Sequence, residues 1–255
     1  MAKSVFLKAA IDAAKAAEPL MLKHYRGNVK VHLKPDESPV TIADQEVEKR
    51  IIRLLRGRFP EHGFFGEESG KQGGKQDYVW IIDPIDGTKN FIRKIPIIST
   101  LIALKHKDEV IVGVSNAPLL GELLYAEKGK GSFLNGKRIH VSTVATLSEA
   151  MVCFGSYRRF IKAGLADRVA GLIDAAKRDR GFGDFYQHHL VATGRAEVAI
   201  EPGIHFWDIA ALQLIIEEAG GRVTELDGQK ISESTSLCFS SNGKLHPEIL
   251  RFFKT

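Results

Sequence analysis

The spacing of hydrophobic residues near the N-terminus predicts two amphipathic helices. Between residues 3 and 23, apolar side chains recur at intervals of three and four, which places them on one face of a helix. Pro19 lies within this stretch and is expected to kink the helix. A polar loop at 34–39 separates it from a second predicted helix at 42–57, whose core face would carry Val47, Ile51, Leu54 and Leu55.

The middle of the chain has the pattern of a β-sheet. Short runs of β-branched and aliphatic residues occur at 79–82, 100–104, 110–114 and 123–126. Their close spacing favours antiparallel pairing, and Asn135-Gly136 predicts a hairpin turn because both residue types tolerate positive φ angles. We therefore expect residues 1–142 to form an α+β half.

The C-terminal part alternates between helical and strand patterns over longer intervals. Helices are predicted at 160–177, 185–193 and 209–218, strands at 198–200, 222–225 and 237–240, and a last helix near the end of the chain. Gly220 and Gly221 are expected to end the third of these helices. Residues 143–255 should thus form an α/β half, which no long linker separates from the first.

Composition and charge narrow the function classes without selecting one. Hydrophobic residues make up 44% of the chain and charged residues 26%, which is typical of a soluble globular protein. The 36 Lys and Arg residues outnumber the 31 Asp and Glu residues, but they are scattered, and an aspartate interrupts the densest stretch at 177–180. This pattern disfavours a nucleic-acid-binding stripe and fits attraction of an anionic phosphorylated substrate.

Cysteine use and hydropathy predict a cytoplasmic protein. Cys153 and Cys238 lie in apolar sequence without C-x-x-C spacing, so we expect two buried thiols, with a single disulfide as the alternative. No apolar run approaches the ~18 residues of a membrane-spanning helix. The first residues also lack the apolar core of a secretory signal.

The most informative feature is a set of acidic residues at the edges of apolar sequence. Asp83 ends the apolar run 79–82, and Asp86 follows within a D-P-x-D-G-T motif that contains no Lys or Arg. Glu67 and Glu68 lie in a second stretch, F-G-E-E-S. Carboxylates at the mouth of a buried strand need a cationic partner to stay ionised, and oxygen ligands favour Mg²⁺. The pattern predicts a metal-dependent phosphoryl-transfer site.

The residues that follow Asp86 suit a phosphate group. Gly87 lets the backbone approach a ligand closely, and Thr88 opens a predicted helix whose backbone amides would face an anion. An aspartate-rich β-turn without a function is the alternative interpretation of the motif. Its position directly after an apolar strand disfavours that alternative, because reactive groups commonly emerge where a buried strand ends.

Three segments, at 65–69, 80–88 and 203–211, resemble the signatures of the inositol monophosphatase superfamily. The resemblance extends over nearly the whole chain. It implies a five-layered αβαβα sandwich of the inositol monophosphatase type that hydrolyses phosphate monoesters with Mg²⁺. It also implies a homodimer and frequent inhibition by Li⁺.

The resemblance assigns metal-binding roles to individual residues. Glu67, Asp83 and the main-chain carbonyl of Ile85 would hold one Mg²⁺ ion. Asp83, Asp86 and Asp208 would hold a second, and a weaker third ion would share Glu67. Two close metal ions suit an in-line displacement by water, so no covalent nucleophile is needed.

Phosphate binding and water orientation are implied in the same way. The amides of Gly87 and Thr88 would cradle the phosphate, and Asp44 would hydrogen-bond Thr88 so that the pair orients the attacking water. Asp44 also fits a helix capping box with Thr41, and Asp208 also fits a simple N-cap of the helix at 209–218, so both structural alternatives stay open. Adjacent Glu68 is expected to have a supporting role.

Substrate selection is expected from the C-terminal half. The segment R-G-F-G-D-F-Y at 180–186 resembles that of inositol-monophosphatase-like histidinol-phosphate phosphatases. In those enzymes, carboxylates matching Asp184 and Glu201 help receive the substrate's amine and imidazole, while Asp86 and Asp208 also face the substrate. The segment 203–208 is closer to inositol monophosphatases proper, and a helix N-cap is the structural alternative for Asp184.

The sequence therefore supports several hypotheses in order. The first is a histidinol-phosphate phosphatase of histidine biosynthesis, and the second is an inositol 1-phosphate or broad-specificity phosphatase. A bisphosphate nucleotidase ranks lower, and a non-catalytic role in binding nucleic acid or a partner ranks lowest because the metal set is intact. The pair His188-His189 is not expected to share a metal, since neighbouring residues on a helix face different directions.

Overall fold

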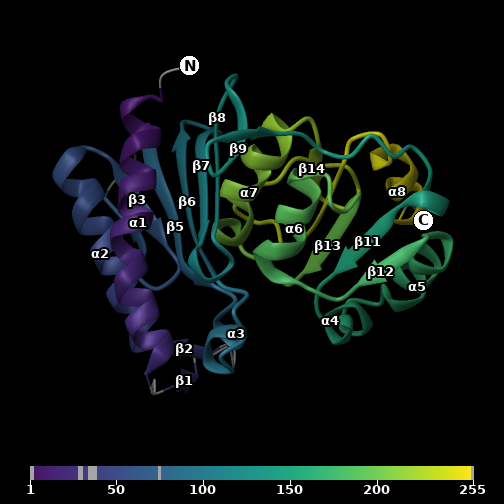
Figure 1. Ribbon diagram of the computed structural model, residues 1–255, viewed down its shortest axis with the longest axis horizontal. Coiled ribbons are helices and arrows are strands. Elements are labelled where there is room, and N and C mark those ends of the chain that lie inside the picture. The colour runs from purple at the N-terminus through teal and green to yellow at the C-terminus, as the bar shows by residue number, and fades with distance from the viewer. Residues whose placement is uncertain (1–2, 28–30, 34–38, 74–75, 254–255) are drawn as a thin grey trace.

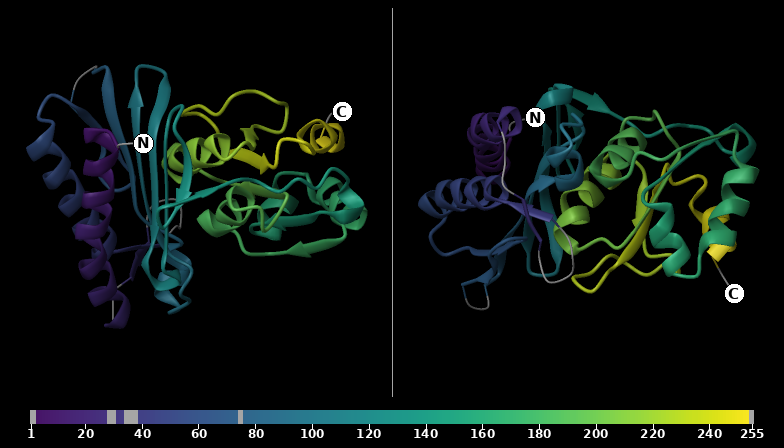
Figure 2. Two further views of the ribbon diagram at one scale, coloured as in Figure 1. Left: turned by 45° about the horizontal axis from the view of Figure 1, so that its top comes forward. Right: turned by 90° about the horizontal axis from the view of Figure 1, so that it is seen from below.

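The computed structural model describes residues 3–27, 31–33, 39–73 and 76–253, and over these residues the elements stack into five layers (Figure 1). Two long helices cover one face of a large sheet. Two helices separate that sheet from a smaller one, and three more cover the outer face of the smaller sheet. Figure 2 shows the same layers from two further directions. The helices are α1 (Val5–Arg26), α2 (Ile42–Arg58), α3 (Thr88–Ile92), α4 (Tyr157–Lys162), α5 (Ala166–Ala175), α6 (Asp184–Ala192), α7 (Phe206–Glu218) and α8 (His246–Phe253), with 3₁₀ turns η1 (Pro118–Leu120) and η2 (Leu147–Glu149).

The large sheet has eight strands over the described residues, in the order β10-β9-β8-β7-β6-β5-β3-β4. All neighbours pair antiparallel except β3 and β5, which are parallel. A separate pair, β1 and β2, lies near α3. The strands are β1 (Val31–Leu33), β2 (Pro39–Thr41), β3 (Gly63–Gly66), β4 (Gly70–Gln72), β5 (Tyr78–Asp86), β6 (Ser99–His106), β7 (Glu109–Ala117), β8 (Glu122–Glu127), β9 (Gly131–Leu134) and β10 (Lys137–Ile139).

The smaller sheet has five strands over the described residues, in the order β12-β11-β13-β15-β14. Strand β11 pairs in parallel with both of its neighbours, whereas β15 pairs antiparallel with β13 and β14. The strands are β11 (Met151–Phe154), β12 (Arg178–Arg180), β13 (Val198–Pro202), β14 (Arg222–Thr224) and β15 (Leu237–Ser241). The mixed order confirms the predicted α/β class and the five-layered sandwich.

Three hydrophobic cores fill the spaces between these layers. The first joins α1 and α2 to the large sheet, and alanines on α1 let that helix approach the sheet closely. The second joins the other face of the large sheet to α6 and α7, so Ile81 of β5 packs in the same core as Ile215 of α7. The third joins the small sheet to α4, α5 and α8. Because the second core draws on both halves of the chain, the division into subdomains 1–142 and 143–255 stays a prediction.

The structure confirms most of the predicted elements. Helices α1 and α2 lie close to the predicted positions, and α1 continues through Pro19 to Arg26. The hairpin turn is confirmed, since Leu134 pairs with Lys137 and both Asn135 and Gly136 have positive φ angles, of 50° and 84°. Of the polar loop predicted at 34–39, residues 34–38 lie outside the described residues.

Other elements differ from the predictions for identifiable physical reasons. The helix predicted at 160–177 is two helices, α4 and α5, because Gly164 between them adopts a positive φ of 69°. Strand β5 continues beyond the apolar run and ends at Asp86. Short strands such as β3, β4 and β12 were not predicted, because three or four residues with glycine or charged side chains lack a recognisable periodicity.

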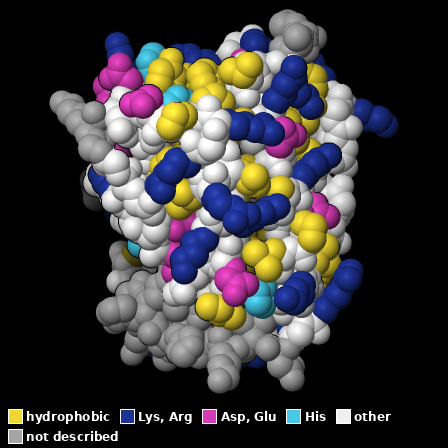
Figure 3. Space-filling view, turned by 90° about the vertical axis from the view of Figure 1, so that its left-hand side faces the viewer, with side chains coloured by type: hydrophobic (Ala, Val, Ile, Leu, Met, Phe, Trp, Pro, Cys, Tyr) yellow, Lys and Arg dark blue, Asp and Glu magenta, His cyan; other side chains and the backbone are white. Residues whose placement is uncertain are grey.

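Surface chemistry agrees with the composition. In Figure 3, Lys and Arg side chains are spread over the visible face with hydrophobic side chains between them, so they form no continuous stripe there. Among the described helices, none is long and apolar enough to cross a membrane. Cys153 and Cys238 are both buried and unpaired, which confirms the predicted thiols.

Gly113 gives a test of the packing between β7 and α7. A Cβ atom at this position would lie 2.5 Å from the Ala211 carbonyl oxygen, and that backbone atom cannot swing aside. We expect Gly113→Ala to lower the free energy of unfolding by about 1–3 kcal/mol through overpacking. Gly171→Ala is the control, because Gly171 lies within α5 with open space around it, so alanine should stabilise by about 0.5–1 kcal/mol. Urea unfolding measures both, and shifts of the same sign would contradict the packing argument.

Candidate active site

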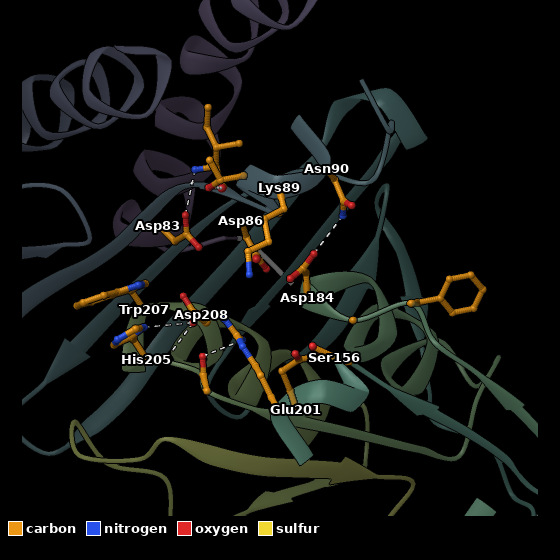
Figure 4. A pocket seen from close by; sticks show the side chains of 18 of the residues that line it. Asp83, Asp86, Lys89, Asn90, Ser156, Asp184, Glu201, His205, Trp207 and Asp208 are labelled. Carbon is orange, nitrogen blue, oxygen red and sulfur yellow. Dashed lines mark hydrogen bonds and ion pairs between the residues drawn. The ribbon is translucent and has the colours of Figure 1, made fainter. Parts of the chain in front are cut away.

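A cavity of about 610 Å³ opens where the end of β5 meets the beginnings of α3, α6 and α7 (Figure 4). It collects nearly every residue that the sequence singled out, although these residues are far apart along the chain. The predicted site residues that line it are Glu67, Asp83, Ile85, Asp86, Gly87, Thr88, Asp184, Glu201 and Asp208. Asp44 is the exception among the predicted site residues, since it does not line this cavity.

An irregularity at the end of β5 brings Asp83 and Asp86 to one cavity. Side chains three residues apart in a regular strand point to opposite faces of the sheet. Here Asp83 pairs with Leu101 and Asp86 pairs with Ser99, so three steps along β5 match two along β6 and the extra residue forms a bulge. The Thr100 hydroxyl holds the bulge by donating to the Pro84 carbonyl at 2.8 Å. Both carboxylates therefore face the cavity.

The turn after β5 needs glycine. Gly87 has a φ of 87°, and a Cβ atom there would lie 2.7 Å from the Ile97 carbonyl oxygen. Thr88 begins α3, and its hydroxyl donates to the Ile85 carbonyl at 3.1 Å. The backbone at Gly87 and Thr88 therefore forms part of the cavity wall beside Asp86.

Glu67 reaches the cavity from the strand next to β5. It directly follows β3, and its amide donates to the Ile82 carbonyl at 3.1 Å, which extends the parallel pairing of β3 with β5. Its neighbour Phe65 makes an edge contact with Trp207, with ring centroids 5.2 Å apart. This contact ties the strand that leads to Glu67 to the helix that carries Asp208.

Asp208 corrects one structural alternative. Helix α7 begins at Phe206 and not at Ile209, so Asp208 lies inside the first turn and is not the N-cap. Its Oδ2 accepts the His205 amide at 2.8 Å, which is the reciprocal arm of a capping box. The first turn of a helix stabilises a carboxylate through the backbone dipoles, and it also directs this one into the cavity.

Burial and mutual repulsion dominate the electrostatics of these carboxylates. Burial, followed by the nearby carboxylates of Glu67, Asp86 and Asp208, raises the pKa of Asp83 well above its usual range. Burial, followed by Asp184 and Asp208, does the same to the pKa of Asp86. Burial, followed by Glu67, raises the pKa of Asp208 to about 8. None of the groups that act on Asp83 is a cation.

The donor chemistry at this end of the cavity fits a hard divalent cation. Carboxylate and carbonyl oxygens are the ligands that Mg²⁺ prefers, and a cation would relieve the repulsion that raises these pKa values. The side chains do not yet converge: among the described residues, no three acidic, histidine or cysteine side chains are arranged to hold one ion. The reason is visible in their hydrogen bonds, since Asp83 accepts the Ile85 amide, Asp86 the Phe185 amide and Asp208 the His205 amide.

The opposite end of the cavity holds a second acidic pair. Asp184 is the first residue of α6, and Gly183 is its N-cap, so the N-cap alternative for Asp184 is wrong. Asp184 has a φ of 51°, and its Oδ2 accepts the Asn90 side-chain amide at 3.1 Å. Glu201, at the end of β13, accepts a hydrogen bond from Gln187, and burial followed by Asp184 raises its pKa well above the usual range.

Sequence reasoning missed three polar residues of this cavity. Lys89 and Asn90 directly follow the D-P-x-D-G-T motif, and their position at the start of α3 was a usable signal. Arg159 of α4 gave none, because only the tertiary structure brings it to the turn after β13. There its Nη1 donates to the carbonyls of Pro202 and Gly203 at 3.1 and 3.0 Å. Lys89 and Arg159 both oppose the rise in the pKa of Asp184.

Asp44 makes contacts that differ from the expected ones. Its Oδ2 accepts both the amide and the hydroxyl of Thr41 at 2.7 Å, so the capping box is present. Thr88 donates to Ile85, and the expected hydrogen bond between Asp44 and Thr88 is not formed, so that expectation is wrong here. Asp44 Oδ1 has no hydrogen-bond partner among the described residues, and burial is the main cause that raises the Asp44 pKa to about 6.

His188 and His189 have separate structural roles, as the sequence predicted. His188 Nδ1 bonds the Ser240 hydroxyl at 2.9 Å. His189 bonds Ser115 through Nε2 and Glu122 through Nδ1, at 2.7 and 3.0 Å. Each ring is buried and occupied by its own partners, so no metal is shared between them.

Fold and cavity together define a sugar-phosphatase-like sandwich with an acidic active site, and the comparisons place it in a family. The model of the inositol monophosphatase family matches residues 2–255, and the chain belongs to that family. The histidinol-phosphatase of Mycobacterium tuberculosis is 41% identical over 228 residues, covering 88% of this chain and 87% of that protein. The inositol monophosphatase of Dictyostelium discoideum is 37% identical over 234 residues, covering 88% and 86%.

Solved structures agree with the sequence relatives. The extragenic suppressor protein suhB of Bartonella henselae superposes with a TM-score of 0.92 at 30% identity, covering 99% of both chains. An inositol monophosphatase of Thermotoga maritima has a TM-score of 0.90 at 34% identity, covering 98% of this chain and 97% of that one. The protein is therefore a phosphomonoesterase of the histidinol-phosphatase or inositol-monophosphatase type, from a family of metal-dependent phosphatases.

The raised pKa of Asp208 predicts how metal-free stability depends on pH. The folded protein keeps this proton up to about pH 8, whereas the unfolded chain releases it near its ordinary value of 3.8. The contribution to stability is therefore complete below about pH 4 and is lost as the pH rises through about 8. In EDTA, Asp208→Asn should flatten the fall in melting temperature across this range. Parallel profiles for the two proteins would contradict the assignment.

Proposed function

We propose that the protein is a Mg²⁺-dependent histidinol-phosphate phosphatase that acts in histidine biosynthesis. The observation that carries this proposal is a single cavity with two distinct acidic ends. One end has carboxylates without cationic neighbours, at Glu67 and Asp83, and the other has Asp184 and Glu201 beside a pair of cations. A metal-binding end and an amine-binding end are what a phosphorylated amino alcohol requires.

Several residues would hold two or three Mg²⁺ ions at the first end. They are Glu67, Asp83, Asp86, Asp208 and the Ile85 carbonyl, all of which line the cavity. Bound divalent cations supply activation of water and neutralisation of the leaving oxygen. The backbone amides of Gly87 and Thr88 would receive the phosphate and fix its orientation.

Asp44 and Thr88 would orient the attacking water. The proposal for Asp44 rests on its Oδ1, which is buried and has no partner among the described residues, while Oδ2 is occupied by Thr41. Such an oxygen can accept a proton or a hydrogen bond from water without disturbing the helix cap. We further propose, on family membership alone, a cytoplasmic homodimer that is sensitive to Li⁺.

The acidic pair at the second end would receive the substrate's cation. Asp184 and Glu201 face the cavity within hydrogen-bond reach of side-chain amides, and the carboxylates of Asp86 and Asp208 lie on the path between the two ends. A cationic amine would favour ionisation of Glu201, whose pKa is raised mainly by burial. The 41% identity to a histidinol-phosphatase supports the same substrate.

Inositol 1-phosphate is the second candidate substrate. Lys89 and Arg159 reduce the negative charge near Asp184, which weakens the selection of a cation and suits a neutral polyol. The inositol monophosphatase of Dictyostelium discoideum is nearly as similar as the histidinol-phosphatase. Substrate preference therefore has to be measured directly, on a panel of histidinol phosphate, inositol 1-phosphate, fructose 1,6-bisphosphate and 3′-phosphoadenosine 5′-phosphate.

Asp83→Asn tests the metal-dependent mechanism. The variant removes a carboxylate that would serve two ions, so kcat/KM should fall by several kcal/mol of transition-state stabilisation, or about a hundredfold or more. Asp77→Asn is the control, because Asp77 is exposed beside the opposite end of β5 and should leave turnover unchanged. Full activity of the wild type in EDTA, or of Asp83→Asn in saturating Mg²⁺, would contradict the proposal.

Asp184→Asn tests the substrate. Asparagine tolerates the positive φ of 51° at this position, so the backbone should be retained while the charge is lost. A charge-assisted hydrogen bond is worth roughly 1.5–3 kcal/mol, so kcat/KM for histidinol phosphate should fall about 10- to 100-fold. Inositol 1-phosphate should be affected much less, and exposed Asp179→Asn should change neither. Equal losses on both substrates would argue for a structural role of Asp184.

A further inference from the structure

Glu48 is a buried carboxylate outside the cavity that touches the turn carrying Glu67. It lies on α2, and only 2% of its surface is exposed. Its Oε2 accepts the Glu68 amide at 2.9 Å, and the side chain and amide of Ser69 also hydrogen-bond to it. A Cβ atom on Gly66 would lie 2.5 Å from the Glu48 carboxyl carbon, so the strand passes directly over this group.

The contacts hold the turn between β3 and β4 from the side opposite the cavity. On the strand side, the Glu67 amide is fixed to the Ile82 carbonyl at 3.1 Å. On the helix side, the next two residues direct their donors at one carboxylate. A carboxylate only accepts hydrogen bonds, which matches a site formed entirely by donors, whereas an amide group would direct N–H groups at them.

We propose that Glu48 is the positioning residue for Glu67, and that it sets the affinity of the first metal site by holding the 67–69 turn. The inference rests on the proposed function, because it requires that Glu67 bind a divalent cation. Hydrogen-bond partners that orient a metal-ligating carboxylate typically change metal affinity by about 10- to 100-fold when they are removed. Glu48 is well placed for this effect because burial keeps water from replacing its contacts.

Glu48→Gln tests the proposal, with Glu46→Gln as the matched control on the same helix. Glu46 bonds His24 at 2.8 Å and is 44% exposed, so its replacement should leave metal binding unchanged. Binding of Mn²⁺ to EDTA-stripped protein is measured by electron paramagnetic resonance, without any substrate. Glu48→Gln should raise the dissociation constant by about 10- to 100-fold. The Mg²⁺ concentration for half-maximal activity should rise in parallel, and kcat should recover at saturating Mg²⁺.

Two further variants separate the possible outcomes. If Glu48→Gln does not fold, as judged by its melting temperature in EDTA, Ser69→Ala removes one donor from the same contact at an exposed residue. A weaker affinity for Mn²⁺ in Ser69→Ala supports the proposal, and an unchanged affinity overturns it. Wild-type affinity in folded Glu48→Gln, with affinity lost in Glu67→Gln, also overturns the positioning role and leaves the proposed function intact. Wild-type affinity in Glu67→Gln overturns the metal assignment itself.

Discussion

Repulsion among buried carboxylates is the constraint on which the rest of this structure depends. Asp83, Asp86 and Asp208 lie in one cavity, and their proximity and burial raise each pKa. Such an arrangement is unfavourable in isolation, so the surrounding fold has to hold it. Each carboxylate accepts a backbone amide, and these hydrogen bonds keep the group in place until a cation neutralises the cluster.

The layers of the sandwich explain how the cluster is held. The β5 bulge turns two aspartates toward one cavity, and the parallel pairing of β3 with β5 delivers Glu67 beside them. Helix α7 lies against the large sheet in the shared core, so its first turn presents Asp208 from the other side. The close approach at Gly113 and the edge contact between Phe65 and Trp207 keep these supports at a constant separation.

The two ends of the cavity differ in how their charge is balanced. Around Asp83 no neighbouring cation lowers the pKa, so the repulsion there is left for a metal ion to relieve. Around Asp184, Lys89 and Arg159 provide partial compensation from the protein itself. A partly neutralised end can discriminate among organic groups, whereas an uncompensated end selects for a small, highly charged ion. This difference connects the electrostatics to a phosphatase that separates metal binding from substrate recognition.

The sequence by itself determined the chemistry and most of the elements, because both depend on local patterns. The D-P-x-D-G-T motif after an apolar run predicted an acidic site at Asp83 and Asp86, and the helical and strand periodicities predicted α1, α2 and the central strands of the large sheet. Short strands such as β3 and β12 were not predictable, since pairing with neighbours and not periodicity makes them strands.

Only the tertiary structure decided which partner each side chain meets. Arg159 reaches the turn after β13 through chain folding that no local signal specifies, and Thr88 bonds Ile85 in place of Asp44. The helix boundary at Phe206 moved Asp208 from a cap into the first turn. Long-range contacts of this kind depend on how whole layers pack, which residue spacing along one chain does not encode.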